Sequence, residues 1–309
     1  MALDAASELG YRYKPTLAYP VSGRLHFMTN ESEDQTVEII AAHPKLFFFS
    51  SLIPEMHIPF CADFGPNSIC DVFAFCEFVH ETVHHAKLKH RQLIYYTSVH
   101  EHHITNSVFL ICCYLMLEEG FSAEEAADQF DAIRGLPVIP FHDATWSERS
   151  YRLSVRDCLL GLQKAIAVQL LDLASFDAET YHELHEAQNF DITRISPKFV
   201  AFATPKSEAD EYTDARQPSD HAGPFRHLGV TDVVRLSGKG KYDDEDFVVE
   251  GFRHHALEFD DCTCPTADFV KRFLDVCDAA GDGVVAVHCL AGLGRTGTLI
   301  ACHMIKHQG

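Results

Sequence analysis

The chain has 309 residues, of which 47% are hydrophobic and 23% are charged. This composition is ordinary for a globular protein, and the length is sufficient for about two domains. Asp and Glu number 45 against 25 Lys and Arg, which gives a formal net charge of −20. Phosphate backbones and anionic lipids repel so acidic a protein, and we therefore expect neither a nucleic-acid nor a membrane partner.

The N-terminal residues contain no basic region followed by an apolar run, so we expect no secretory signal. No stretch approaches the roughly 18 apolar residues of a membrane span, and we expect none. The eleven cysteines are scattered, without a CxxC pair. Reduced thiols in the cytoplasm or nucleus are therefore expected, rather than a disulfide framework or a zinc knuckle.

Short apolar runs alternate with helical patterns along the chain. Residues 1–22 carry no strong pattern, and we expect them to be flexible. Apolar runs predict strands at 46–49, 92–96, 199–202, 231–236 and 283–287. Helical spacing predicts helices over 71–88 and 107–117 and two that begin at the capping sequences 122–125 and 154–157. This alternation predicts an α/β fold in both halves of the chain.

Residues 177–190 are polar and lack an apolar stripe. We interpret them as a linker helix between two domains, a first covering 23–176 and a second covering 191–309.

The predicted strand at 283–287 runs directly into a glycine-rich loop, HCLAGLGRTG, at 288–297. The loop matches the dinucleotide pattern GxGxxG, but that fold needs an acidic residue about 20 positions later, and none follows. It also half-matches a nucleotide P-loop, but Thr298 stands where the lysine is needed. Both interpretations therefore fail.

The third interpretation is a phosphate-binding loop of the form Cys-x5-Arg, from Cys289 to Arg295. Backbone amides at a helix N-terminus hold a phosphate dianion, and the same field stabilises a nucleophilic thiolate. Arg295 offers a planar fork for two phosphate oxygens, Thr296 can hydrogen-bond the sulfur, and His288 can orient the loop. The substrate cradle is then formed by Leu290, Ala291, Gly292, Leu293 and Gly294. A lone cysteine after a strand is usually an inert core thiol, but this spacing is far more specific.

The sequence VHCLAGLGRTG resembles the signature of the cysteine-based protein phosphatases, both tyrosine and dual-specificity. Over about residues 23–309 the chain is most similar to the cell division cycle fourteen branch, which acts at mitotic exit. Further segments carry this resemblance: 23–27, 61–66, 140–143, 157–161, 198–202 and 230–236. It implies two tandem dual-specificity-phosphatase-like domains, each with a mostly parallel sheet flanked by helices, of which only the second is catalytic.

The resemblance also implies a general acid in a loop upstream of the cysteine. The matching pattern here begins at Asp261, four residues before Pro265, and Asp260 is the fallback. Taken alone, either carboxylate would be a solvated loop charge. The implied reaction needs neither metal nor cofactor, and the paired histidines are interpreted as surface or core residues.

An internal repeat accompanies the resemblance. Ser98 and Thr105 precede Cys289 and Thr296 by the same number of positions. In this first copy the arginine position is occupied by Ile104, and Glu101 and His103 replace the glycines at 292 and 294. The first copy therefore lacks the thiolate and the guanidinium, and we expect it to form a wall of the substrate groove.

Family resemblance implies phosphoprotein substrates in which proline and then a basic residue follow the phosphoserine. The acidic residues that are candidates for recognising that basic residue are Glu183, Glu186 and Asp191. Cytoplasm and nucleus, with spindle pole, centrosome or nucleolus, are the implied locations, and cell cycle control, mitotic exit and cytokinesis are the implied roles. The oligomeric state stays open.

The favoured hypothesis is a metal-independent dual-specificity phosphatase. In the family, further helices and a glutamine-bearing loop that positions water follow the signature, whereas this sequence stops at Gly309. We therefore expect a truncated catalytic domain. A catalytically impaired phosphopeptide-binding fragment is the alternative. A phosphoinositide or RNA 5′-phosphatase is disfavoured because Leu290, Ala291 and Leu293 supply no basic groups for a polyanion.

Overall fold

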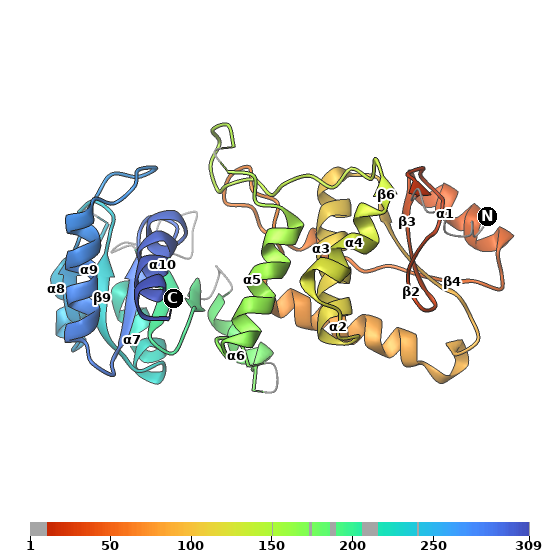
Figure 1. Ribbon diagram of the computed structural model, residues 1–309. Coiled ribbons are helices and arrows are strands. Elements are labelled where there is room, and N and C mark those ends of the chain that lie inside the picture. Colours follow the sequence, from red (N-terminus) through yellow and green to blue (C-terminus); the bar gives the residue numbers. More distant parts are fainter. Residues whose placement is uncertain are drawn as a thin grey trace. The chain divides into compact units, whose positions relative to one another are not determined.

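The computed structural model describes residues 11–149, 151–172, 175–185, 190–205, 216–239 and 241–308. The chain divides into two compact units, Met1–Phe176 and Asp177–Gly309. Each unit contains its own sheet and helices (Figure 1). The predicted α/β fold class is confirmed.

The first unit is built on a four-stranded sheet. Its order is β2 (Tyr19–Ser22), β3 (Leu25–Asn30), β5 (Leu93–Ser98) and β4 (Phe47–Phe49). The edge strand β2 pairs with β3 antiparallel, and the other pairings are parallel. A separate parallel pair joins β1 (Tyr11–Arg12) to β6 (Ile133–Arg134).

Helices cover both faces of this sheet. On one face Ile39 of α1 (Glu33–Ala42) packs against Met28 and Ile94. The larger core on the other face takes in α2 (Ile69–His84), α3 (Glu101–Leu117), α4 (Ala123–Asp131) and α5 (Val155–Ala167). Capping boxes start α4 at Ser122 and α5 at Ser154, where the sequence predicts them. Short 3-10 turns lie at η1 (Ile53–Glu55) and η2 (Ala86–Leu88).

The expectation that residues 1–22 are flexible is wrong for the described part, 11–22. Strand β2 closes the sheet edge, and Tyr19 and Val21 are buried in the main core. The Tyr19 hydroxyl also accepts a hydrogen bond from the Lys14 backbone amide. Alternate residues of a short edge strand are enough to anchor it, and this signal is too brief to read as a periodicity.

The second unit contains a five-stranded sheet in the order β10 (Arg253–Ala256), β9 (Val230–Arg235), β11 (Val284–His288), β8 (Phe199–Phe202) and β7 (Ile192–Arg194). The edge strand β7 is antiparallel to β8, and all other pairings are parallel. The central β11 is buried along its whole length. Its continuous apolar run fits a strand covered on both faces.

Two apolar cores lie on the two faces of this sheet. On one face Phe273 of α9 (Ala267–Ala279) and Leu299 of α10 (Gly294–Gln308) pack against Val285 and Val287. On the other face, Phe225 of α7 (Pro218–His227) and Phe247 of α8 (Asp244–Val249) pack against Val233 and Ala286. The sheet is thus sandwiched between two helical layers.

The two units repeat one topology. In each unit an edge strand, β2 or β7, pairs antiparallel with the next strand, β3 or β8. That second strand lies beside a central parallel strand, β5 or β11. Each central strand is followed by a long helix, α3 after β5 and α10 after β11. The internal repeat seen in the sequence therefore corresponds to equivalent positions in two similar sheets.

The segment at 177–190 begins with α6 (Ala178–His185), and residues 186–189 lie outside the described residues. Leu184 packs against the second unit's core, and the His185 Nδ1 atom lies 2.8 Å from the Thr193 hydroxyl. Helix α6 therefore contacts strand β7 of the second unit. No helix in the described part of the chain is long and apolar enough to cross a membrane.

Candidate active site

The glycine-rich loop connects the C-terminal end of β11 to the N-terminus of α10. Cys289 is the first residue after the strand and is buried, at 3% exposure. The loop is held against the neighbouring strand because the Thr204 amide donates to the Leu290 carbonyl at 3.0 Å, and the Thr204 hydroxyl donates to the Cys289 carbonyl. Ligands of parallel α/β sheets bind at this edge, where the strands end.

Gly292 adopts a left-handed conformation with φ of +72°. A Cβ atom there would lie 2.4 Å from the carbonyl oxygen of Phe202. The position therefore needs glycine for two reasons, the backbone angle and the close approach of β8. This tight turn brings the Gly292 amide onto the sulfur of Cys289, to which it donates.

The Cys289 thiol has a lowered pKa. Burial alone would raise it, but hydrogen bonds from the Thr296 hydroxyl and from the Thr296 and Gly292 amides, together with the charge of Arg295, outweigh burial. The Thr296 oxygen is fully buried, and no carbonyl, carboxylate or other hydroxyl among the described residues competes for it. These groups are the donors that a thiolate nucleophile requires.

Arg295 is buried, and backbone carbonyls hold its guanidinium group. Its Nη1 atom donates to the Phe259 carbonyl at 2.9 Å and to the Leu236 carbonyl at 3.2 Å. These carbonyls follow β9 and β10. The arginine is therefore fixed in orientation beside Cys289, and its Nη2 group takes no part in these carbonyl contacts.

His288 is completely buried, and this burial lowers its pKa to about 3, so the ring is neutral. Its Nε2 atom lies 2.7 Å from the Tyr242 hydroxyl, and its Nδ1 atom lies 3.1 Å from the Cys289 carbonyl and 3.3 Å from the Thr204 hydroxyl. His288 thus fixes the backbone at Cys289. Tyr242 and Thr204 could not be identified from the sequence, because both lie far from the loop along the chain.

The candidate acid loop lies against the arginine. Asp261 Oδ1 is 3.1 Å from Arg295 Nε, and its side chain is 56% exposed. Asp260 is also exposed, and its backbone carbonyl accepts a hydrogen bond from the Thr263 hydroxyl at 2.6 Å. Of these two residues, Asp261 is thus the one whose carboxylate lies against an arginine of the loop.

The other predicted substrate residues fall into two groups. In the loop, Leu290 and Leu293 are half exposed, at 49% and 52%. Both side chains are apolar and bring no charge to the loop. Of their neighbours, Ala291 is partly buried and Gly294 is exposed.

Of the acidic candidates, Glu183 is exposed on α6. Asp191 is partly buried at the start of β7, and burial raises the pKa of its carboxyl group. Glu186 lies outside the described residues.

The equivalent loop of the first unit has different chemistry. Ser98 ends β5, its hydroxyl lies 2.8 Å from His103 Nδ1, and His103 in turn lies 3.4 Å from Glu55. Ile104, at the arginine position, is completely buried in the apolar core. This loop therefore contains neither the thiol nor the guanidinium of the second unit's loop, and its histidine faces a carboxylate.

Two family models match the chain. Residues 20–165 match the N-terminal half of dual specificity protein phosphatases, and residues 210–309 match the DSP-PTPase phosphatase of polymorphic toxin systems. In solved structures, the crystal structure of TpbA from P. aeruginosa aligns with 39% of this chain and 66% of that chain, at 22% identity and a TM-score of 0.31.

Curated relatives cover most of the chain. It is 36% identical over 251 residues to the human dual specificity protein phosphatase CDC14C, which is 80% of this chain and 56% of that protein. It is 32% identical to the CDC14 homolog of Schizosaccharomyces pombe, over 91% of this chain and 53% of that protein. For CDC14 of Saccharomyces cerevisiae the identity is 30%, over 86% of this chain and 49% of that protein. The chain thus spans about half the length of the curated relatives it matches.

The lowered pKa of Cys289 predicts its alkylation profile. The rate of reaction with iodoacetamide should reach half its maximum below pH 9.0, the ordinary thiol value, because the thiolate is the reacting form. Thr296→Val removes a hydroxyl donor and should shift that midpoint upward. Mass spectrometry of the Cys289 peptide against pH measures both, and a profile unchanged by Thr296→Val contradicts this assignment.

The backbone at Gly292 predicts a strong effect of an added methyl group. Gly292→Ala combines a positive φ with a clash against β8, and strain of this kind costs about 1–3 kcal/mol. Phosphate or vanadate affinity should fall, while Gly297→Ala, where a Cβ meets nothing within 4 Å, should bind as wild type. Equal affinities of the two variants, measured by isothermal calorimetry, would show that the tight turn is unnecessary.

Proposed function

Because this chain belongs to the CDC14 family of dual specificity protein phosphatases, we propose that it hydrolyses phosphoserine, phosphothreonine and phosphotyrosine in proteins. The observation that carries the proposal is a buried thiol whose pKa is lowered by two amides, a hydroxyl and the adjacent Arg295. A thiolate next to a cationic fork is suited to attack a phosphoryl group.

The proposed reaction has two steps. The Cys289 thiolate attacks phosphorus while the ester P–O bond breaks, and Asp261 gives its proton to the leaving oxygen. Water then attacks the phosphocysteine, the S–P bond breaks, Asp261 takes the proton from water, and the thiolate is restored. Arg295 and the loop amides hold the phosphoryl oxygens throughout. Stabilisation of developing charge by fixed donors is the largest contribution to such catalysis.

The finer proposal concerns substrate sequence. A proline and then a basic residue after the phosphoserine would suit the acidic chain, and Glu183, exposed on α6, lies in the same unit as the catalytic loop. Asp191 and Glu186 are further candidates. Cell cycle control, mitotic exit and cytokinesis are the proposed roles. Cytoplasm and nucleus, with spindle pole, centrosome or nucleolus, are the proposed locations. The eleven cysteines, all within the described residues, are free thiols.

Single-site variants test the reaction. Cys289→Ser should abolish release of phosphate from an aryl phosphate, and Asp261→Asn should lower kcat on a phosphopeptide by about 10²–10⁴-fold. Asp260→Asn is the matched control and should stay near wild type. Stopped-flow kinetics also separate the two steps: a burst of alcohol without turnover would mean that hydrolysis of phosphocysteine has failed. Normal turnover by Cys289→Ser, or binding without any burst in the wild type, would reject the proposal.

Matched peptides test the preference for a basic residue. Phosphoserine-proline peptides with Lys three positions after the phosphoserine should have a higher kcat/KM than peptides with Ala there. Glu183→Gln should reduce this Lys-to-Ala ratio of kcat/KM by about two- to fivefold, the range of an exposed ion pair. The reduction should weaken at high salt. Glu179→Gln, an exposed change on the same helix, is the control. An unchanged Lys-to-Ala ratio in Glu183→Gln would show that Glu183 does not recognise the basic residue.

A further inference from the structure

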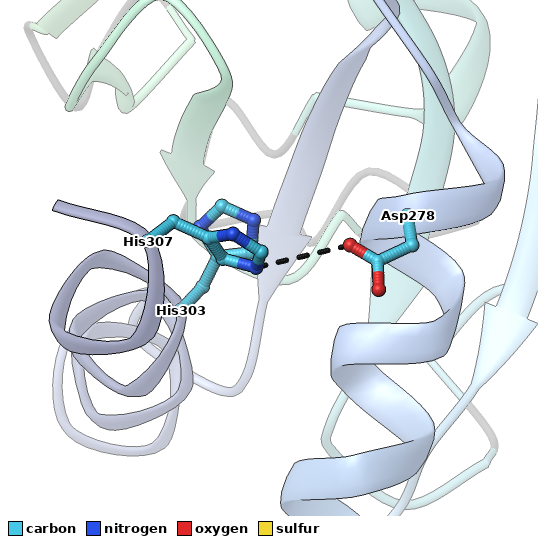
Figure 2. Close-up of side chains that lie close together, drawn as sticks. All are labelled: Asp278, His303 and His307. Carbon is cyan, nitrogen blue, oxygen red and sulfur yellow. Dashed lines mark ion pairs between the residues drawn. The ribbon is translucent and has the colours of Figure 1, made fainter.

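Helices α9 and α10 bring together three potential metal ligands away from the phosphate loop. His303 and His307 lie one turn apart on α10, and Asp278 lies near the end of α9, as Figure 2 shows. One ligand atom from each residue lies within 4.8 Å of the others, and His307 Nε2 is 3.8 Å from Asp278 Oδ1. The spacing of four residues places both imidazoles on one face of the helix.

We propose that Asp278, His303 and His307 bind a divalent transition-metal cation of the Zn²⁺ class and thereby connect α9 to α10. Two imidazoles with one carboxylate form an accepted zinc ligand set, with water at the fourth position. This function is additional to phosphate chemistry, since none of the three residues lies in the loop that surrounds Cys289.

The polar surroundings support a cation here. His303 Nδ1 is buried and has no hydrogen-bond partner among the described residues. An unpaired buried polar atom is costly, and a metal or its water would satisfy it. Burial lowers the pKa of His303, and the nearby His307, Lys198 and Lys306 lower it further, against the charge of Asp278.

The geometry needs a small adjustment. Ligand atoms around a tetrahedral zinc lie about 3.3 Å apart, given Zn–N and Zn–O distances near 2.0–2.1 Å. The side chains of His307 and Asp278 are 38% and 54% exposed, so both can rotate inward. His303 is more constrained, since its ring packs edge-on against Phe199 at 4.8 Å between ring centroids. It supplies the fixed ligand, and the other two close on it.

A neighbouring lysine competes with the metal. Lys306 Nζ lies 3.8 Å from Asp278 Oδ2, and its side chain is 48% exposed. Binding of a cation would displace this ammonium group into solvent. Removing the lysine charge should therefore strengthen metal binding, whereas removing a ligand should weaken it. Nonspecific adsorption to surface histidines does not predict these opposite effects.

A second histidine pair with the same spacing provides a matched control. His80 and His84 lie on α2, and Glu118 lies 2.8 Å from His80 Nδ1. Here the Nδ1 atom of His84 already lies 2.9 Å from the His80 carbonyl, so each ring has a protein partner. Removal of His84 should leave the metal affinity unchanged.

The test is a Co²⁺ titration of the full chain, kept reduced with a phosphine. Wild type should show d–d absorption without a thiolate-to-cobalt charge-transfer band, because the ligands are nitrogen and oxygen. His307→Ala and Asp278→Asn should each weaken binding at least about tenfold, the lower limit for disturbing a metal site. Lys306→Gln should tighten it, and His84→Ala should match wild type. Zn²⁺ should then raise the melting temperature of wild type but not of His307→Ala.

Three results would overturn the proposal. The first is a charge-transfer band in wild type, which would assign the metal to cysteines such as Cys262 and Cys264. The second is unchanged affinity in both His307→Ala and Asp278→Asn. The third is an equal loss in His84→Ala, which would show general binding to histidines. Since His307 and Asp278 are both on the surface, circular dichroism should show folded variants, and a variant that fails to fold is replaced by His307→Gln.

Discussion

The loop of the second unit is organised around stabilising negative charge on a sulfur that is only 3% exposed. Burial opposes that charge, and the loop overcomes the opposition with two amides, one hydroxyl and one guanidinium. All of these donors must converge within the few residues between β11 and α10. The positive φ of Gly292, the neutral ring of His288 and the carbonyl anchors of Arg295 all serve this convergence. Electrostatic preorganisation of this kind is formed during folding, before any substrate arrives.

The two units share one topology but differ in the chemistry of the loop after the central strand. Both central strands end at the same edge of a sheet and lead into a long helix. In the first unit the arginine position holds Ile104, which extends the apolar core, and Ser98 pairs with a histidine. The fold is therefore compatible with either outcome, and the side chains of a single turn decide between them.

The sequence predicted the elements around the loop because their signals are local. The apolar run at 283–287 and the glycine pattern after it define the strand, the turn and the helix start. Helix α3 was less predictable: it begins at Glu101 rather than 107, since Asn106 is polar but buried, and donates to the carbonyls of Pro54 and Phe64. Tyr242 and Thr204, which hold His288, could not be found either. Their contacts bring together residues separated by 46 and 84 positions, and such pairs leave no periodic trace.

The anchoring of Arg295 has a thermodynamic consequence. Its guanidinium is bound to the carbonyl of Phe259, immediately before the acid loop, and its Nε lies beside Asp261. One side chain thus belongs to the proposed anion site and also contacts the segment that carries the proposed proton donor. An anion that favours one orientation of the guanidinium must also favour one position of that segment, and the reverse holds to the same degree. Anion binding in the loop and the position of the Asp261 segment are consequently coupled equilibria.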